Sequence, residues 1–171
     1  MKALTLWQPW ASLVAVGWKG IETRSWGTDY RGPLAIHAAL TMPTEGRALA
    51  TRNLDVMRAL HPLTAATLPL GKVVAVVHLW RVARIVSVLD SRKVTRLRTN
   101  CGDIDIDARE LVVGDYTPGR YVWFVNGARQ PEPPVPARGN RMLWDWDATE
   151  EVMKGAADAA NRVQASLFGG E

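Results

Sequence analysis

The longest run of β-forming residues, from Gly71 to Leu89, constrains the fold of this chain more than any other feature. Valine and isoleucine recur through the run, and neither proline nor a further glycine interrupts it. Such residues favour a β-strand, because branched side chains pack well on a pleated surface. One strand of this length must bend, or pass around a barrel, to stay within a small domain. The run therefore predicts a twisted sheet or barrel at the centre of the fold.

Shorter segments on both sides of this run predict a mixture of strands and helices. Segment 103–113 fits either a strand or a helix, segment 130–139 with its prolines fits a loop or an edge segment, and Asn126-Gly127 predicts a turn. Alternating or β-branched patterns predict strands, and apolar residues at helical spacing predict helices. The expected strands are 3–6, 21–26, 33–38, 120–125 and 142–146, and the expected helices before the long strand are 9–16 and 41–60.

The length of 171 residues and a hydrophobic content of 47% suit one domain with a substantial core. A last helix is expected from about 147 to 168, where Asp147 and Glu150 form a capping-box pattern ahead of an apolar stripe. Short strands with few, scattered helices indicate an α+β domain. We therefore expect a single domain over 1–171, with a small mixed β-barrel over about 1–146 flanked by helices and the C-terminal helix packed on it.

The composition argues against several classes of protein. Cys101 is the single cysteine, so the chain forms no internal disulfide, and no Cys/His cluster has zinc spacing. Asp103, Asp105 and Asp107 alternate and would share one strand face, which fits a metal site but is more typical of a solvated acidic edge. The start lacks a signal-peptide pattern, and no apolar run reaches about 18 residues. We expect a cytoplasmic protein without a metal or cofactor.

Positive charge gathers in one part of the chain. The formal net charge is +4, but residues 61–98 alone carry seven lysines and arginines against one acid, Asp90. Residues 99–116 have the opposite balance, with five acids against Arg109. A basic front half suits a polyanionic partner such as nucleic acid. A solvated charged surface explains the same pattern equally well, so charge alone leaves both interpretations open.

The segment from Trp7 to His37 combines aromatic and charged side chains at high density. It holds four of the eight tryptophans, and within it Lys19, Glu22 and Arg24 have the form K-x-x-E-x-R. Flat aromatic faces can stack on bases, and fixed cations can contact phosphate oxygens. The residues suited to these contacts are Trp10, Trp26 and Tyr30 by stacking, and Lys19, Arg24 and Arg31 by charge.

This segment resembles the ASCH domain, the module named for its homology to the activating signal cointegrator complex. The resemblance is dense over residues 4–38, returns at 139–144, and in motif is closest to the C-terminal ASCH domain of that eukaryotic transcription coactivator. It implies a PUA-like β-barrel that binds RNA, single- or double-stranded DNA, or a nucleotide in a basic, aromatic-lined cleft beside the first helix. The residues that carry it are Gln8-Pro9-Trp10-Ala11-Ser12-Leu13, the G-x-K-x-x-E-x-R pattern at 17–24, Ser25-Trp26 and Tyr30-Arg31-Gly32.

The resemblance and the side-chain chemistry together define a candidate nucleic-acid site. On the family pattern Lys19, Glu22 and Arg24 would lie at the cleft, and Glu22 could orient Arg24 or accept from a base amino group. A structural role is the alternative, because Glu22 and Arg24 also suit an ion pair and Lys19 suits a helix end. Trp7 and Trp18 are expected in the core. The complete candidate set is Gln8, Trp10, Lys19, Glu22, Arg24, Trp26, Tyr30, Arg31 and Arg141.

An enzymatic role is the main alternative to binding. Some small bacterial relatives of the family are amidohydrolases on acylated cytidine, with a lysine, a threonine three residues later and a glutamate on a later strand. Lys19 matches the lysine, but Glu22 occupies the threonine position and the long strand 73–88 holds no acid. A weak ribonuclease using Lys19 and Tyr30, and a protein-interaction module, are further alternatives. The mismatch favours binding, with Lys19 as the catalytic residue if the protein is an enzyme.

Overall fold

The structure is a computed structural model, and it describes residues 1–90 and 95–147. The chain forms two compact units. Unit 1 comprises residues 1–18, 33–78 and the chain from 127 onward, and unit 2 comprises residues 19–32 and 79–126. Each unit therefore contains segments that are distant in the sequence. Apart from Asp147, the predicted C-terminal helix lies outside the described residues.

The sheet of unit 1 is built around the first strand of the chain. Its strands are β1 (Lys2–Leu6), β3 (Gly32–Ala38), the beginning of β4 (Lys72–Asp90), β8 (Val135–Pro136) and β9 (Leu143–Asp145). Hydrogen bonds join them in the order β4-β3-β1-β9, and β8 pairs with β4. β1 runs parallel to β3, with Leu4 opposite Ile36, and antiparallel to β9, with Ala3 opposite Trp144. Buried residues of these strands pack with Trp146 in the core of the unit.

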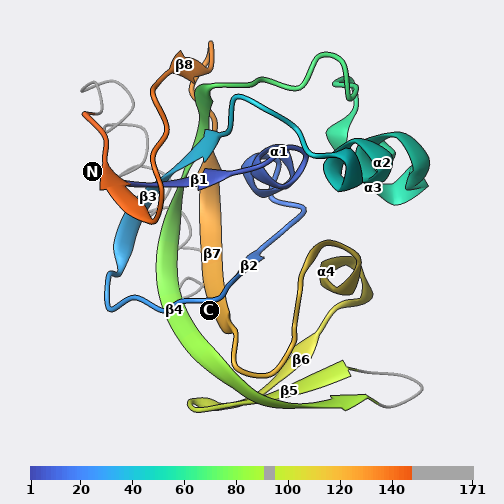
Figure 1. The fold of residues 1–171 in the computed structure, drawn as a ribbon, viewed down its shortest axis with the longest axis vertical. Helices are drawn as coiled ribbons and strands as arrows, with labels where there is room; N and C mark the ends of the chain where they lie inside the picture. The colour runs from blue at the N-terminus through green and yellow to red at the C-terminus, as the bar shows by residue number, and fades with distance from the viewer. Residues whose placement is uncertain (91–94, 148–171) are drawn as a thin grey trace, which may run out of the picture. The chain divides into compact units, whose positions relative to one another are not determined.

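Unit 1 also carries three helices, α1 (Trp10–Ala15), α2 (Thr44–Arg52) and α3 (Leu54–Leu60) (Figure 1). Gly17 follows α1 in the left-handed conformation (φ 72°), as the sequence predicted. The single helix expected over 41–60 is wrong, because the chain breaks at Asn53. Asn53 has an extended backbone, and its side chain accepts the Val56 N–H, so this residue ends α2 and caps α3.

Unit 2 is built on five strands, of which two continue from or into unit 1. They are β2 (Ile21–Arg24), residues 79–90 of β4, β5 (Thr95–Thr99), β6 (Gly102–Ile106) and residues 121–126 of β7 (Tyr121–Arg129). Hydrogen bonds join β2 to β7, β7 to β4, β4 to β5 and β5 to β6. Their buried residues form a core with Tyr116, and α4 (Ala108–Val113) lies between β6 and β7 in the chain (Figure 1). The long strand β4 confirms the prediction, and a bulge between Ile85 and Ser87 interrupts its pairing with β5.

Three features of the second half of the chain differ from the sequence-based expectation. Strand β5 is not among the predicted strands. The ambiguous segment 103–113 holds both kinds of element, because Asp107 ends the strand and caps α4 by accepting the Arg109 N–H (2.8 Å). Asn126-Gly127 does not form a turn, because β7 continues to Arg129 with Gly127 at φ 61°. Glycine can adopt this conformation within an irregular strand, so the pair alone does not end one.

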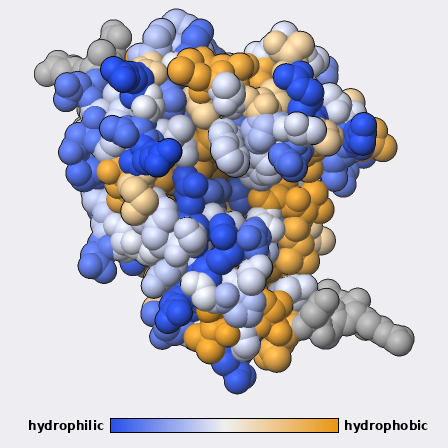
Figure 2. Space-filling view, viewed as in Figure 1, coloured by the Kyte–Doolittle hydropathy of each residue, from blue (hydrophilic) through white to orange (hydrophobic). Residues whose placement is uncertain are grey.

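The mixed α+β class expected from the sequence is confirmed. The described strands form an open path rather than the expected closed barrel. Both units expose some aliphatic side chains, among them Leu54 on α3 and Val112 on α4. Figure 2 shows hydrophobic residues as separate orange areas divided by hydrophilic ones. Within residues 1–90 and 95–147, no helix is both long enough and apolar enough to cross a membrane.

Candidate nucleic-acid interface

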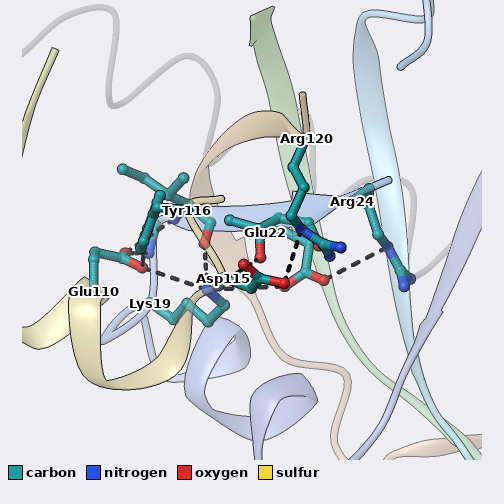
Figure 3. Close-up of polar contacts among 10 residues, drawn as sticks. Lys19, Glu22, Arg24, Glu110, Asp115, Tyr116 and Arg120 are labelled. Carbon is teal, nitrogen blue, oxygen red and sulfur yellow. Dashed lines mark hydrogen bonds and ion pairs between the residues drawn. The ribbon is translucent and has the colours of Figure 1, made fainter. Parts of the chain in front are cut away.

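Lys19 is the centre of a buried polar cluster in unit 2 (Figure 3). Its side chain is 0% exposed, and its ammonium donates to the carbonyl oxygen of Ile21. Two carboxylates accompany the charge, Glu110 with an Nζ–Oε2 distance of 3.4 Å and Glu22 with 3.8 Å. A buried ammonium without such partners would carry a large desolvation cost. The predicted association of Lys19 with Glu22 is thus present, but inside the unit rather than on an open surface.

Glu110 is the main residue of this cluster that sequence reasoning missed. Its carboxylate accepts the backbone N–H groups of Gly20 (2.5 Å) and Ile21 (3.0 Å) in addition to Lys19. It therefore joins α4 to the start of β2, across about 90 residues of sequence. Glu110 lies three residues before Val113, and both residues are buried on one face of α4, but a glutamate at this spacing is not by itself a sequence signal for burial.

Tyr116 completes the buried end of the cluster. Its hydroxyl donates to Glu110 at 3.4 Å. Burial raises the pKa of this phenol, and the negative charge of Glu110 raises the pKa further. Tyr116 is therefore a neutral donor. Both oxygens of the Glu110 carboxylate have partners: Oε1 accepts the two backbone N–H groups, and Oε2 contacts Lys19 and Tyr116.

Glu22 and Arg24 continue the cluster toward the surface along β2. They lie two residues apart on the strand and so share a face, and the Arg24 Nε is 3.5 Å from Glu22 Oε1. Exposure of the side chains rises from 0% at Lys19 through 12% at Glu22 to 25% at Arg24. The cluster thus leads from a buried ammonium to a partly exposed arginine side chain. Figure 3 shows these side chains and their contacts.

Arg120 and Asp115 form a second ion pair beside this cluster, and sequence reasoning did not single out either residue (Figure 3). The Arg120 Nε lies 3.2 Å from Asp115, and its Nη2 donates to the Thr23 carbonyl oxygen at 3.4 Å. The Thr117 hydroxyl, with a smaller contribution from Arg120, holds the pKa of Asp115 below its usual range. Arg120 is therefore already matched by a carboxylate.

Trp26, Tyr30 and Arg31 lie in the connection after β2, within the same unit. Trp26 is half-buried and meets Trp123 edge to face, with ring centroids 4.7 Å apart, and the Trp123 indole N–H donates to the Trp26 carbonyl. Arg31 is exposed and donates to the carbonyl oxygens of Thr28 and Tyr30. Among the described residues no carboxylate lies within ion-pair distance of Arg31, so its charge faces solvent unmatched.

The remaining candidates, Gln8, Trp10 and Arg141, belong to unit 1. Gln8 is fully buried: its amide N–H₂ donates to Ser12 Oγ and the Pro69 carbonyl, and its amide oxygen accepts the Ser12 N–H. These contacts fix the entry to α1. Trp10 is half-buried and Arg141 is exposed. The expectation that Trp7 lies in the core is wrong, because Trp7 is 58% exposed.

The alternating aspartates at 103, 105 and 107 each face an arginine. Arg96 contacts Asp105 with both Nε (2.5 Å) and Nη2 (3.0 Å), and this contact lowers the pKa of Asp105. The other two pairs are Arg98 with Asp103, at 3.5 Å, and Arg109 with Asp107, at 2.9 Å. The positive side-chain charges of β5 are therefore balanced by the negative charges of β6. The arginine-rich segment 61–98 is less basic in the folded protein than its composition suggests.

The family comparison agrees with the motif. A family model described as the ASCH domain matches residues 4–106, which is more than half of the chain. The chain belongs to the ASCH family. ASCH domains are PUA-like and are generally associated with RNA, so membership supports nucleic-acid binding in general terms. No curated protein matches the sequence significantly. The match includes Lys19, Glu22 and Arg24, but it ends before Glu110.

Proposed function

We propose that this protein binds nucleic acid, RNA in the first place, through the surface of unit 2 at the end of β2. The observation that carries the proposal is the position of Arg24. Its side chain is 25% exposed at the outer end of the Lys19–Glu22 cluster, and Trp26, Tyr30 and Arg31 follow in the next seven residues of the chain. Single- or double-stranded DNA or a nucleotide is the alternative ligand.

The chemistry of these four residues suits a nucleic-acid chain. Arg24 and Arg31 can donate to phosphate oxygens, and the planar guanidinium allows two parallel hydrogen bonds. Trp26 and Tyr30 are partly exposed and can stack on bases, an interaction of about 1–3 kcal/mol per base. In unit 1, Trp10 and Arg141 are candidates for further contacts, and Gln8 supports Trp10 by fixing the entry to α1.

Lys19 and Glu22 have a supporting role in this proposal. Lys19 is buried, and its ammonium already has three partners, so it acts on the ligand through Glu22 and Arg24 rather than by direct contact. Glu22 holds Arg24 in place, and a preorganised guanidinium loses less conformational entropy when it binds phosphate.

Binding is tested by fluorescence anisotropy with a labelled single-stranded RNA over a range of salt concentrations. Arg31→Gln should weaken binding about tenfold and lower the salt slope by about one. Arg24→Gln should also weaken binding, because a guanidinium donor is lost, but it should change the salt slope less, because Glu22 partly balances the charge of Arg24. Arg96→Gln is the matched control, because this arginine is exposed but paired with Asp105. The proposal fails if the parent protein does not bind RNA or DNA, or if the folded Arg24 and Arg31 variants bind as the parent does.

A hydrolase acting on a modified nucleoside is a second candidate, and one observation favours it. Glu110 supplies a carboxylate 3.4 Å from the Lys19 ammonium, although the sequence offered no glutamate on the long strand. Turnover of acetylated cytidine that Lys19→Ala abolishes would support this function, and so would slow RNA cleavage with the same dependence. Absence of turnover at high enzyme concentration removes it. A cytoplasmic location and a particular likeness to the coactivator domain stay predictions.

A further inference from the structure

We propose that Arg84 and Tyr121 extend the interface of Arg24 into a row of three side chains across unit 2, and that this row selects single-stranded nucleic acid. The inference rests on the proposed function. It concerns residues outside the sequence motif, on strands β4 and β7. Its basis is strand register, exposure and the pairing of charges.

The register of the strands places these residues in one row. Arg24 on β2 is directly opposite Tyr121 on β7, and directly opposite residues project from the same face of a sheet. On the other side of β7, the Ile85 N–H donates to the Arg120 carbonyl at 2.8 Å. One residue further along each strand, Arg84 therefore lies beside Tyr121. Neighbouring strands are about 4.8 Å apart, so the backbones of Arg24 and Arg84 are about 10 Å apart with Tyr121 between them.

Arg84 has the properties of a ligand-binding cation. Its backbone is held by Asn100, which accepts the Arg84 N–H through its side chain (2.8 Å) and donates its own N–H to the Arg84 carbonyl (3.1 Å). The side chain is exposed, and within residues 1–90 and 95–147 no carboxylate forms an ion pair with it. Arg96 and Arg98, which follow on β5, are instead paired with Asp105 and Asp103. Among the described residues, Arg96 and Arg98 thus each have a carboxylate partner, whereas Arg84 has none.

Tyr121 supplies an aromatic ring between the two guanidinium groups. The ring lies against Gly27, where an added Cβ would come within 2.6 Å of the tyrosine Cε1. Glycine at this position therefore lets the ring rest against the backbone of the connection after β2. The residue remains half-buried, so it is packed against the protein and still accessible to solvent.

The order cation, ring, cation matches a base with a phosphate on each side. Stacking requires a base face that is not already covered, and such faces are available in single strands, loops and ends. In a continuous duplex the bases are paired and stacked on one another, which leaves the phosphates as the accessible groups. An aromatic side chain within the basic row therefore favours a single strand over a duplex.

The test compares a labelled single-stranded RNA, the single-stranded DNA of the same sequence and the corresponding duplexes, with thermal melting as a check on folding. Arg84→Gln should weaken single-strand binding about fivefold to tenfold and lower the salt slope by about one. Tyr121→Ala should weaken it at least about fivefold, and Tyr121→Phe should keep parental affinity, because the ring rather than the hydroxyl stacks. Arg98→Gln, paired with Asp103, is the control and should bind as the parent does.

The outcomes separate this inference from the function on which it rests. If Arg84→Gln binds as the parent while Arg24→Gln is weakened, the row is wrong and the proposed function stands. If duplexes bind more tightly than single strands, the preference for single strands is overturned. If the parent binds none of these nucleic acids, the proposed function itself fails. If Tyr121→Ala does not fold, Arg84→Glu tests whether Arg84 belongs to the interface. Reversal of an exposed charge there should weaken binding more than Arg84→Gln does.

Discussion

Removal of the Glu110 carboxylate should destabilise the protein strongly. Glu110→Ala leaves the buried Lys19 ammonium with Glu22 at 3.8 Å as its remaining carboxylate, and it removes the acceptor of two backbone N–H groups. Breaking one side of a buried ion pair costs about 3–5 kcal/mol. An unsatisfied buried donor costs about 1–3 kcal/mol, and this cost overlaps with the first because one carboxylate serves all these groups. We therefore expect the free energy of unfolding to fall by about 3–5 kcal/mol.

Urea unfolding with linear extrapolation measures this loss, provided that the m-value of the variant equals that of the parent. Glu110→Gln should lose less than Glu110→Ala, because its carbonyl oxygen can still accept a backbone N–H. Adding Lys19→Met to Glu110→Ala should recover part of the loss, because it removes the uncompensated charge. Asp105→Asn, in an exposed ion pair, is the control with little expected effect. A loss below about 1 kcal/mol for Glu110→Ala, or no recovery in the double variant, would refute the reasoning.

Three further predictions concern unit 1. Burial lowers the pKa of His37, so the neutral form is favoured in the folded state. The contribution of His37 to the free energy of unfolding should therefore be fully present above pH 6.5 and decline as the pH falls below it. In urea unfolding between pH 7.5 and 5, His37→Gln should reduce this decline. Gly139→Ala should lower the free energy of unfolding by about 1–3 kcal/mol, because the added Cβ would come within 2.4 Å of the His37 ring. Gly20→Ala in unit 2 is the comparison, because its added Cβ has no contact under 3.6 Å. An equal loss of stability in both variants would contradict the explanation. Asn53→Ala should cost about 1 kcal/mol, measured by thermal melting, because α3 loses the acceptor for the Val56 N–H; an unchanged melting temperature would exclude the cap.

Local signals in the sequence predicted most of the strands but not every boundary. The β-branched run that became β4 and the Gly17 stop after α1 depend on neighbouring residues alone, so they could be predicted. The break at Asn53 could not, because the apolar pattern continues on both sides of a residue that helices tolerate. Strand β5 has the alternating sequence T-R-L-R-T, and β6 has G-D-I-D-I. Opposite charges at matching spacing were thus a usable signal for this hairpin.

In the candidate site, too, some residues could be predicted from the sequence and others could not. Lys19, Glu22 and Arg24 were predictable as a group, because their spacing along one short segment decides which of them share a face. Glu110 joins them through contacts with residues about 90 positions earlier in the chain, and no local pattern encodes such a contact. Tertiary packing therefore added the partner that makes the burial of Lys19 possible.

The number of basic residues in a segment is a poor guide to the surface that a polyanion meets. Residues 61–98 are the most basic part of the sequence, yet Arg96 and Arg98 form ion pairs with aspartates of the neighbouring strand. Lys19, the residue that the motif marks most strongly, is buried and matched by two carboxylates. Arg31 and Arg84 have no such partner among the described residues, although no motif argument ranks either of them first. Because a paired charge attracts a phosphate far less than an unpaired one, the salt dependence of binding should follow Arg31 and Arg84 rather than the total charge of their segments.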